Sequence, residues 1–187
     1  QLNAAGTASI TADQIDNGSS DNCSIASMVV SPDTFTCANV GDNTVSLTVT
    51  DASGNESFAT AVVTVQDLVG PTVVTQPVTV QLNAAGTASI TADQIDNGSS
   101  DACGIDTITV SPNTFTCANV GANTVTLTVT DVNGNEATAT AVVTIIVDFT
   151  TAGDNDLDGI PDNCDDDDDN DGVLDINDNC PMQANTD

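Results

Sequence analysis

An internal repeat of 80 residues constrains this chain more than any other feature of its sequence. The stretch QLNAAGTASITADQIDNGSS occurs at 1–20 and again, letter for letter, at 81–100. SPDTFTCANVGDNTVSLTVTDASGNE at 31–56 likewise returns, with substitutions, at 111–136. A period of this length accommodates one small domain per copy. We place repeat 1 at 1–66, repeat 2 at 67–147, a linker at 148–153 and a different C-terminal segment at 154–187.

The pattern within each repeat is that of β-strands. In NTVSLTVTD, Val45, Leu47 and Val49 alternate with Ser and Thr, and TATAVVTII at 138–146 alternates in the same way. Alternation with a period of two is typical of half-buried strands. The sequences DASGNE and DVNGNE each separate two such runs and predict a hairpin with a glycine turn. About seven short strands fit each repeat, so the sequence predicts an all-β fold of tandem immunoglobulin-like β-sandwiches.

Three short motifs in each repeat resemble the bacterial form of the hyaline repeat (HYR), an immunoglobulin-like module of secreted and surface proteins. They are DNC or DAC at 21–23 and 101–103, FTCANVG at 35–41 and 115–121, and the D-x-x-G-N turns at 51–55 and 131–135. The resemblance covers residues 1–147. It implies adhesion or architecture and no catalysis, as in large surface proteins of Bacteroidetes-like bacteria.

The two repeats differ at their start. GPTVVTQPVTV at 70–80 precedes Gln81 and is typical of an opening strand, whereas no residue precedes Gln1 in the sequence. We therefore expect repeat 1 to lack its first strand. Either the sequence is an excerpt that begins within the domain, or a neighbouring chain supplies the strand.

The 28 acidic residues have no basic counterpart, because the chain contains no Lys, Arg or His. Without His or Lys there is no imidazole base, Schiff-base amine or Ser-His-Asp triad, so the composition argues against an enzyme. A net charge of −28 argues against a nucleic-acid partner, and the lack of a long apolar stretch argues against direct membrane insertion. No internal salt bridge between side chains is possible, so clustered acids must be solvated or bound to an external cation.

Six cysteines favour an oxidising, extracellular setting. The two cysteines of repeat 1 are fourteen residues apart, as are those of repeat 2, and two more bracket the acidic run near the C-terminus. Zinc is disfavoured because the chain has no CxxC pair and no His. Reduced buried thiols are the alternative to disulfides within the repeats. The sequence predicts three disulfides, namely Cys23–Cys37, Cys103–Cys117 and Cys164–Cys180.

Aspartates near the C-terminus recur at the spacing of a calcium-binding loop. DNDLDGIPDNCD at 154–165 is followed thirteen residues later by DDDNDGVLDIND at 167–178. Alternate carboxylates lie on one side of a curled backbone, glycine at position 6 permits a sharp turn, and position 7 offers its carbonyl oxygen. Aspartate at position 12 and the lack of flanking helices argue against an EF-hand. The predicted calcium ligands are Asp154, Asp156, Asp158, Ile160, Asp162 and Asp165 in loop 1, and Asp167, Asp169, Asp171, Val173, Asp175 and Asp178 in loop 2.

This pattern, with its bracketing cysteines, resembles the thrombospondin type 3 repeat across residues 154–181. The resemblance implies an irregular chain wrapped around at least two Ca²⁺ ions, with almost no hydrophobic core and with consecutive cysteines joined. Asp166, Asp168 and Asn170 fall between the ligand positions and either complete a further ion or face water. The alternative for the whole segment is a disordered acidic tail.

A further calcium site is expected where the repeats meet. In an immunoglobulin-like sandwich, the loop after the second strand and the last hairpin turn share the end nearest the incoming linker. In repeat 2 those loops carry Asp101 and Asp131, and the incoming linker at the start of this repeat carries Asp67. Converging carboxylates repel one another unless a cation joins them. The alternative is that all three are solvated turn residues.

Together these features predict a non-enzymatic, secreted structural or adhesive repeat module, stabilised by calcium, within a long bacterial surface protein, stalk or filament. The expected partners are other copies or repeats of the same protein, or a surface ligand. The alternative is an accessory region of a secreted hydrolase whose catalytic domain lies outside this chain. A carbohydrate-binding module is disfavoured because Trp and Tyr, which stack on sugars, are absent.

Overall fold

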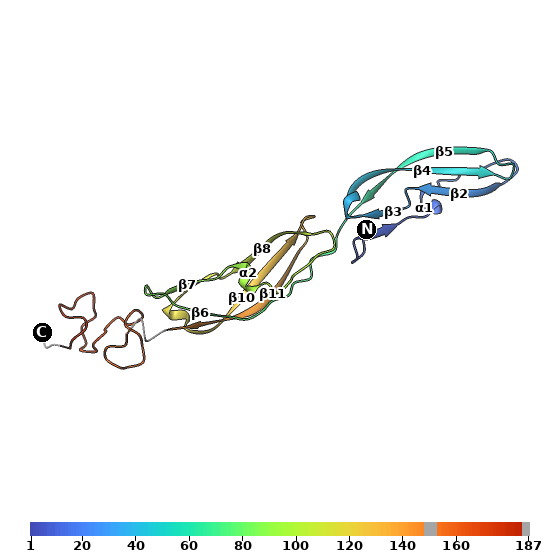
Figure 1. Cartoon of the computed structure of the whole chain (residues 1–187). Coiled ribbons are helices and arrows are strands. Elements are labelled where there is room, and N and C mark those ends of the chain that lie inside the picture. Colours follow the sequence, from blue (N-terminus) through green and yellow to red (C-terminus); the bar gives the residue numbers. More distant parts are fainter. Residues whose placement is uncertain (148–152, 185–187) are drawn as a thin grey trace. The chain divides into compact units, whose positions relative to one another are not determined.

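The computed structural model describes residues 1–147 and 153–184, and the all-β prediction is confirmed (Figure 1). The chain divides into two compact units, which we describe separately. The first unit comprises residues 1–72, 100–106 and 130–136, and the second comprises the remaining described residues. Two loops of repeat 2 therefore belong to the same compact unit as repeat 1.

Repeat 1 folds into two small antiparallel sheets. Its elements are β1 (Thr7–Ser9), α1 (Ala12–Ile15), β2 (Ile25–Ser31), β3 (Thr34–Thr36), the 3-10 turn η1 (Cys37–Asn39), β4 (Gly41–Asp51) and β5 (Glu56–Val65). One sheet has the order β2-β4-β5, with Val30 opposite Leu47, and the other pairs β1 with β3. The alternating apolar positions close over a core of Leu2, Val30, Phe35, Val45 and Val65.

The elements of repeat 2 follow their counterparts at the same spacing of 80 residues. They are β7 (Thr87–Ser89), α2 (Ala92–Ile95), β8 (Ile105–Ser111), β9 (Thr114–Thr116), the 3-10 turn η2 (Cys117–Asn119), β10 (Gly121–Asp131) and β11 (Glu136–Ile146). The strand expected from GPTVVTQPVTV is present as β6 (Val78–Gln81), which pairs in parallel with β11. The main sheet therefore has four strands, in the order β6-β11-β10-β8.

Within 1–147 the repeats contain five and six strands, fewer than the roughly seven expected for such a sandwich. Repeat 1 has no counterpart of β6, and in both repeats the loops that follow α1 and α2 form no strand. There the Asp16 carboxylate accepts hydrogen bonds from the backbone N–H groups of Gly18 and Ser19, and Asp96 does the same in repeat 2. Side-chain acceptors that satisfy local backbone donors favour a turn over a strand.

The D-x-x-G-N motif builds the hairpin turn of each repeat as predicted. Asp51 Oδ1 accepts a hydrogen bond from the Asn55 backbone N–H at 2.8 Å, and Asp51 Oδ2 accepts one from Asn55 Nδ2 at 2.6 Å. Gly54 has a φ of 85°, which disfavours any residue with a side chain. Asp131 and Asn135 make the equivalent bonds in repeat 2.

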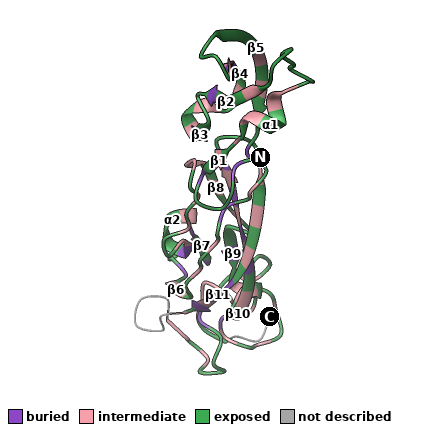
Figure 2. Cartoon of the chain, turned by 90° about the vertical axis from the view of Figure 1, so that its right-hand side faces the viewer, coloured by how far each residue is buried: buried purple, intermediate pink, exposed green. Residues whose placement is uncertain are grey.

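Equivalent positions of the two repeats are buried to different depths, and Figure 2 marks the buried residues in purple. Ile95 and Val129 are fully buried in repeat 2, whereas Ile15 and Val49 are only partly buried in repeat 1. In repeat 2 the segment before β6 lies along α2, where the Gln76 N–H donates to the Ile95 carbonyl oxygen at 2.9 Å. The opening segment therefore completes the core of a repeat.

The disulfides differ from the expected pairs. Cys37 is bonded to Cys103, and Cys117 is bonded to Cys164. Cys23 and Cys180 are exposed and unbonded among the six cysteines, all of which are described. The structure thus replaces the predicted Cys23–Cys37, Cys103–Cys117 and Cys164–Cys180 with links that join successive parts of the chain.

The length of the strands explains this difference. Cys23 lies just before β2, whose Ile25 is opposite Asp51 at one end of β4, whereas Cys37 lies just before the other end. An eleven-residue strand spans about 33 Å at about 3.3 Å per residue, while a disulfide requires Cα atoms within about 7 Å. The same spacing operates in repeat 2, where β10 is equally long.

A local contact accounts for the third change of partner. Asn163, next to Cys164, donates a hydrogen bond from its side-chain amide to the Asn83 carbonyl oxygen at 2.9 Å. This contact holds Cys164 beside Cys117 rather than beside Cys180.

Candidate calcium-binding site

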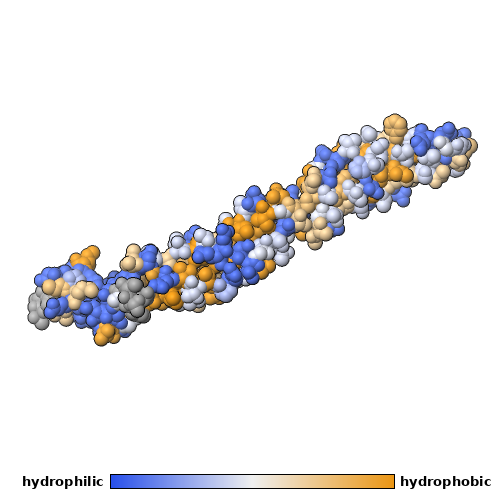
Figure 3. Space-filling view, viewed as in Figure 1, coloured by the Kyte–Doolittle hydropathy of each residue, from blue (hydrophilic) through white to orange (hydrophobic). Residues whose placement is uncertain are grey.

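The C-terminal segment is folded by turns around its aspartates. Within 153–184 the structure has no helix or strand, and only Pro161 and Asp168 are buried. Most of this segment is intermediate or exposed in Figure 2, and hydrophilic residues cover much of it in Figure 3. So little apolar burial provides almost no hydrophobic driving force for folding. Another interaction must hold this segment in its conformation.

The first three predicted carboxylates of each loop converge. Each set offers one oxygen per residue, and the oxygens of a set lie within 4.8 Å of one another. Calcium binds oxygen ligands at about 2.3–2.6 Å, so two ligands of one ion can be separated by at most about 5 Å. Each set therefore fits a single Ca²⁺ ion. The sets are Asp154, Asp156 and Asp158 in loop 1, and Asp167, Asp169 and Asp171 in loop 2.

An equivalent hydrogen bond from a backbone N–H to an aspartate carboxylate closes both loops. In loop 1 the Asn155 N–H donates to Asp162 Oδ1 at 2.8 Å, and in loop 2 the Asp168 N–H donates to Asp175 Oδ1 at 2.9 Å. The bond links position 2 to position 9 in each case. It draws the position-9 carboxylate towards the start of its loop, where the first ligands lie.

Glycine at position 6 reverses the chain in each loop. Gly159 and Gly172 have φ angles of 95° and 93°, a conformation that side-chain-bearing residues rarely adopt. The N–H of the next residue then donates to the position-5 carboxylate, at 2.8 Å for Ile160 and 2.9 Å for Val173. Ile160 and Val173, whose carbonyl oxygens are the predicted position-7 ligands, therefore lie in these turns.

Several buried carboxylate oxygens have no hydrogen-bond donor. An unsatisfied buried acceptor costs about 1–3 kcal/mol, and more when it is charged. The chain has no Lys, Arg or His that could compensate for these oxygens. A hard divalent cation would satisfy them, and an all-oxygen ligand set suits calcium rather than zinc. These oxygens include Asp154 Oδ1, Asp156 Oδ2, Asp167 Oδ1, Asp168 Oδ1 and Asp169 Oδ2.

Asp168 faces the two loops rather than water. Its burial raises the pKa of the Asp168 carboxyl to about 6, assisted by repulsion from Asp175, Asp162 and Asp165. Burial is also the main cause that raises the pKa of Asp169. A cation among these carboxylates would relieve the repulsion. Of the three residues that fall between the ligand positions, Asp168 alone is buried, whereas Asp166 and Asn170 are exposed.

The position-12 aspartates are placed differently from the first three ligands. Asp165 Oδ1 accepts the backbone N–H groups of Asp166 and Asp167, and Asp178 Oδ1 accepts the Cys180 N–H at 3.0 Å. Neither Asp165 nor Asp178 belongs to the two convergent sets. Their role as calcium ligands stays a prediction.

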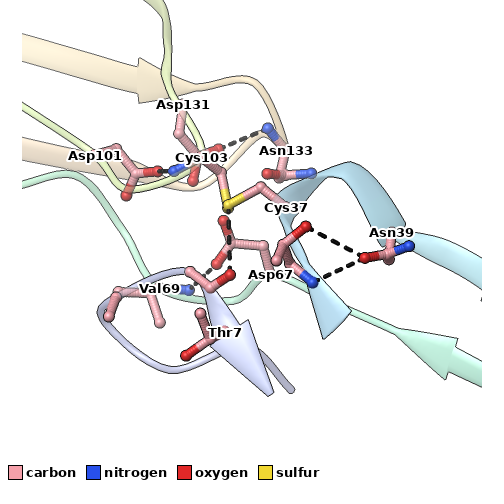
Figure 4. Close-up of a disulfide and its surroundings, with 12 residues drawn as sticks. Thr7, Cys37, Asn39, Asp67, Val69, Asp101, Cys103, Asp131 and Asn133 are labelled. Carbon is pink, nitrogen blue, oxygen red and sulfur yellow. Dashed lines mark hydrogen bonds between the residues drawn. A yellow bond between two sulfur atoms is a disulfide. The ribbon is translucent and has the colours of Figure 1, made fainter. Parts of the chain in front are cut away.

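The structure brings together two of the three aspartates expected at the junction (Figure 4). Oxygens of Asp67 and Asp101 lie within 4.8 Å of each other and of Cys103 Sγ. Cys103 is disulfide-bonded and supplies no thiolate ligand. Asp131 is outside this group, and its carboxylate accepts hydrogen bonds from the backbone and side chain of Asn135. Calcium at this junction stays a prediction.

Comparison with known proteins supports the assignment of the C-terminal segment. The family model of the thrombospondin type 3 repeat matches residues 153–187. This match confirms the resemblance for that segment and supports calcium binding in an extracellular protein. The hyaline-repeat resemblance of residues 1–147 stays a prediction. No helix in the described residues is long and apolar enough to cross a membrane.

The remaining comparisons add little. Curated proteins give no match to the chain. Among solved structures, the endo-fucoidan hydrolase MfFcnA9 from glycoside hydrolase family 107 is similar at 15% sequence identity and a TM-score of 0.26. The match covers 65% of this chain and 28% of that chain. A TM-score this low supports no inference about function.

Proposed function

We propose that this chain is a non-enzymatic structural or adhesive repeat module of a secreted bacterial surface protein, and that calcium stiffens its C-terminal segment. Other repeats of the same protein, or a ligand on a surface, would be its partners. The two convergent carboxylate sets are the observation that carries this proposal. Each set would hold one Ca²⁺ ion, so the segment would bind at least two.

The charge of the segment supports a structural role for calcium. Folding brings carboxylates together in a chain that has no basic side chain. Each bound Ca²⁺ removes two units of negative charge, and its binding free energy adds to the stability of the folded segment. Carboxylate-rich sites with affinities of about 10⁻⁴–10⁻³ M suit extracellular modules. Calcium would therefore keep the segment folded outside the cell.

The repeats support architecture rather than catalysis. Repeat 1 and repeat 2 carry nearly the same sequence and the same elements. Disulfides join repeat 1 to repeat 2 and repeat 2 to the C-terminal segment. Covalent links between successive modules resist extension and proteolysis, which suits a stalk or filament. The general bases, amines and triads that need His or Lys are absent from the composition.

Elastase digestion with and without calcium tests this proposal. Leu157 and Ile176 are highly exposed in the C-terminal segment and are suitable cleavage sites. We expect calcium to protect these sites and a chelator to expose them, while residues 1–147 remain resistant. Asp171→Ala should reproduce the effect of the chelator in loop 2. The control Asp166→Ala, at an exposed position between the predicted ligands, should not. Digestion that is insensitive to calcium would refute the proposal.

A further inference from the structure

Two cysteine motifs account for both disulfides. The tripeptide F-T-C occurs at 35–37 and 115–117. Each F-T-C cysteine is bonded to the cysteine of a D-x-C tripeptide in the next part of the chain, Cys37 to Cys103 and Cys117 to Cys164. The D-x-C tripeptides are DNC at 21–23, DAC at 101–103, and DNC at 162–164 and 178–180.

The two joints have the same local structure, although one leads into a β-repeat and the other into the acidic segment. A Cβ atom on Gly6 would lie 2.7 Å from Cys37 Sγ and 3.2 Å from the Ala102 Cβ. A Cβ atom on Gly86, the equivalent residue, would lie 2.7 Å from Cys117 Sγ and 2.8 Å from the Asn163 carbonyl oxygen. In both joints the residue before the D-x-C cysteine therefore packs onto the same glycine.

Cys23 occupies the D-x-C position of repeat 1. Its N–H donates to Asp21 Oδ1 at 2.8 Å, as the Cys103 N–H donates to Asp101 Oδ1 at 2.7 Å. The two cysteines thus have the same turn, but Cys103 is bonded and partly buried while Cys23 is unbonded and exposed. Both F-T-C cysteines of this chain are already used. Cys180, the other unbonded cysteine, also belongs to a D-x-C tripeptide, so a partner of the F-T-C type for Cys23 would come from a further copy of that motif.

The sheet beside Cys23 also has an open edge. In repeat 2, β6 covers the edge of β11, whereas no described strand pairs with the corresponding edge of β5. Two apolar side chains of β5, Phe58 and Val62, are 79% and 65% exposed. A cleft of about 290 Å³ next to β5 is lined by Leu47, Val49 and Phe58, together with Ser20 and Asp21 beside Cys23. An open edge with apolar neighbours can accept a further strand.

Repeat 2 shows which segment covers the equivalent surface there. There the segment 67–81 forms β6 along β11 and bonds to the loop before Asp101, with the Thr72 N–H donating to the Ser100 carbonyl oxygen at 2.8 Å. The same segment connects to repeat 1, whose Cys37 is bonded to Cys103. In repeat 2, one linker thus covers the sheet edge and one F-T-C turn bonds the D-x-C cysteine. The equivalent edge and cysteine of repeat 1 are the two features that remain open.

We propose that repeat 1 is built to receive another repeat of this kind, joined ahead of Gln1 by a linker similar to residues 67–80. The linker forms a strand parallel to β5, and the F-T-C cysteine of the added repeat bonds Cys23. This inference deepens the proposed structural role, because it supplies the rule by which repeats are joined. It does not depend on calcium, so its failure and the failure of the proposed function are separable.

The bond forms by oxidation of two thiols. The Cys23 thiol and the F-T-C thiol together lose two protons and two electrons to a small disulfide oxidant, such as oxidised glutathione, which leaves as two thiols. The product is one disulfide between the repeats. An oxidising extracellular setting favours this outcome.

Disulfide mapping of an extended chain tests the inference. The full chain is prepared with an extra copy of residues 1–80 ahead of Gln1, refolded in a glutathione redox buffer and treated with an alkylating agent. The extra copy carries Ala26→Ser and Ala38→Ser, two exposed positions that serve as mass labels. Cleavage before aspartate releases Cys23 on the peptide 21–32 and Cys37 on the peptide 33–41. The labels distinguish the peptides of the two copies.

We expect the labelled peptide with Cys37 to be linked to the unlabelled peptide with Cys23. Alkylation of the original Cys23 should fall from nearly complete in the 187-residue chain to nearly absent in the extended chain. A Cys23–Cys37 link within one copy would overturn the inference. Full alkylation of the original Cys23 and of Cys37 in the extra copy would overturn it as well. A Cys23-linked dimer of the unextended chain would also overturn it, because the bond would then not need an F-T-C partner.

A second measurement separates docking from oxidation. The extended chain is prepared with Cys37→Ser in the extra copy, so the new disulfide cannot form. Hydrogen exchange of the amides that face the open edge, those of Thr64 in β5 and of Gln66 just after it, should still be slower than in the unextended chain, because the linker strand pairs with this edge. Unchanged exchange of β5 would show that the edge does not receive the linker and would overturn the proposal.

Discussion

Asp131 and Asp51 form a natural pair for measuring what burial adds to one turn motif. Both carboxylates accept the same hydrogen bonds from the asparagine four residues later. Asp131 is 1% exposed, whereas Asp51 is only partly buried. The Asn135 side chain also donates to the Asp67 carbonyl oxygen at 3.3 Å, which connects this turn to the segment that enters repeat 2. Removal of the buried carboxylate should therefore be the more damaging change.

We expect Asp131→Ala to lower the free energy of unfolding by about 3 kcal/mol. A hydrogen bond to a charged group contributes about 1.5–3 kcal/mol, and a buried donor left without a partner costs about 1–3 kcal/mol. Several such bonds are lost together, and the turn can relax in part. Asp51→Ala should cost clearly less, because water can reach the donors that it leaves.

Urea unfolding followed by far-ultraviolet circular dichroism, at constant calcium concentration, measures the difference. With a slope of about 1–3 kcal/mol per molar urea, a loss of 3 kcal/mol lowers the midpoint by about 1–3 M. Equal midpoint shifts for the two variants would show that burial by the segment around Asp67 does not set the strength of this turn. A larger loss for Asp51→Ala would show the same.

Four further results are expected. Burial alone would raise the pKa of Asp131, but the hydrogen bonds from Asn135 and the backbone outweigh burial and lower the pKa. The stability that the Asp131 carboxylate adds is therefore present above the unfolded pKa of 3.8 and is lost as pH falls through the lower folded pKa. The urea midpoints of wild type and Asp131→Ala should accordingly converge in acid. Gly86→Ala should destabilise the joint by about 1–3 kcal/mol through overpacking, measured by thermal unfolding, because its Cβ would lie 2.8 Å from a backbone oxygen; no change in midpoint would contradict this close approach. Gly172→Ala should weaken calcium binding in loop 2, because φ is 93° there, and unchanged affinity by calorimetry would argue against the turn. Asp67→Ala should remove any calcium-dependent stiffening of the junction in small-angle scattering, and dimensions that ignore calcium would leave these aspartates as turn residues.

Local patterns in the sequence predicted much of the fold. Alternation in NTVSLTVTD predicted β4, the D-x-x-G-N motif predicted its turn, and GPTVVTQPVTV predicted a strand where β6 lies. Each of these features depends on residues that are close in the sequence. The same holds for the calcium loops, where carboxylates two residues apart converge because one glycine turns the chain.

The disulfides could not be predicted from spacing alone. A separation of fourteen residues suggested a local loop between Cys23 and Cys37. The seven-residue strand β2 lies between them and carries the chain along the sheet. A strand of this length separates its ends by about 20 Å. Recognising a strand between the two cysteines, rather than counting residues, would have excluded the pair.

Asp168 shows a second limit of the sequence. It falls between the ligand positions, so its side chain was expected either to complete a further ion or to face water. The structure buries it against the carboxylates of both loops. The relative placement of the two loops decides this contact, and a single-loop pattern contains no information about it.

Calcium titration by isothermal calorimetry measures how many Ca²⁺ ions the C-terminal segment binds. We expect at least two Ca²⁺ ions per chain, with dissociation constants of about 10⁻⁴–10⁻³ M, and the loss of one ion in Asp171→Ala but none in Asp166→Ala. With a dissociation constant of about 10⁻⁴ M, calcium at about 2 mM would stabilise each site by about 1.8 kcal/mol. A chain that binds no calcium, or an Asp171→Ala variant that binds as many ions as the wild type, would contradict the account.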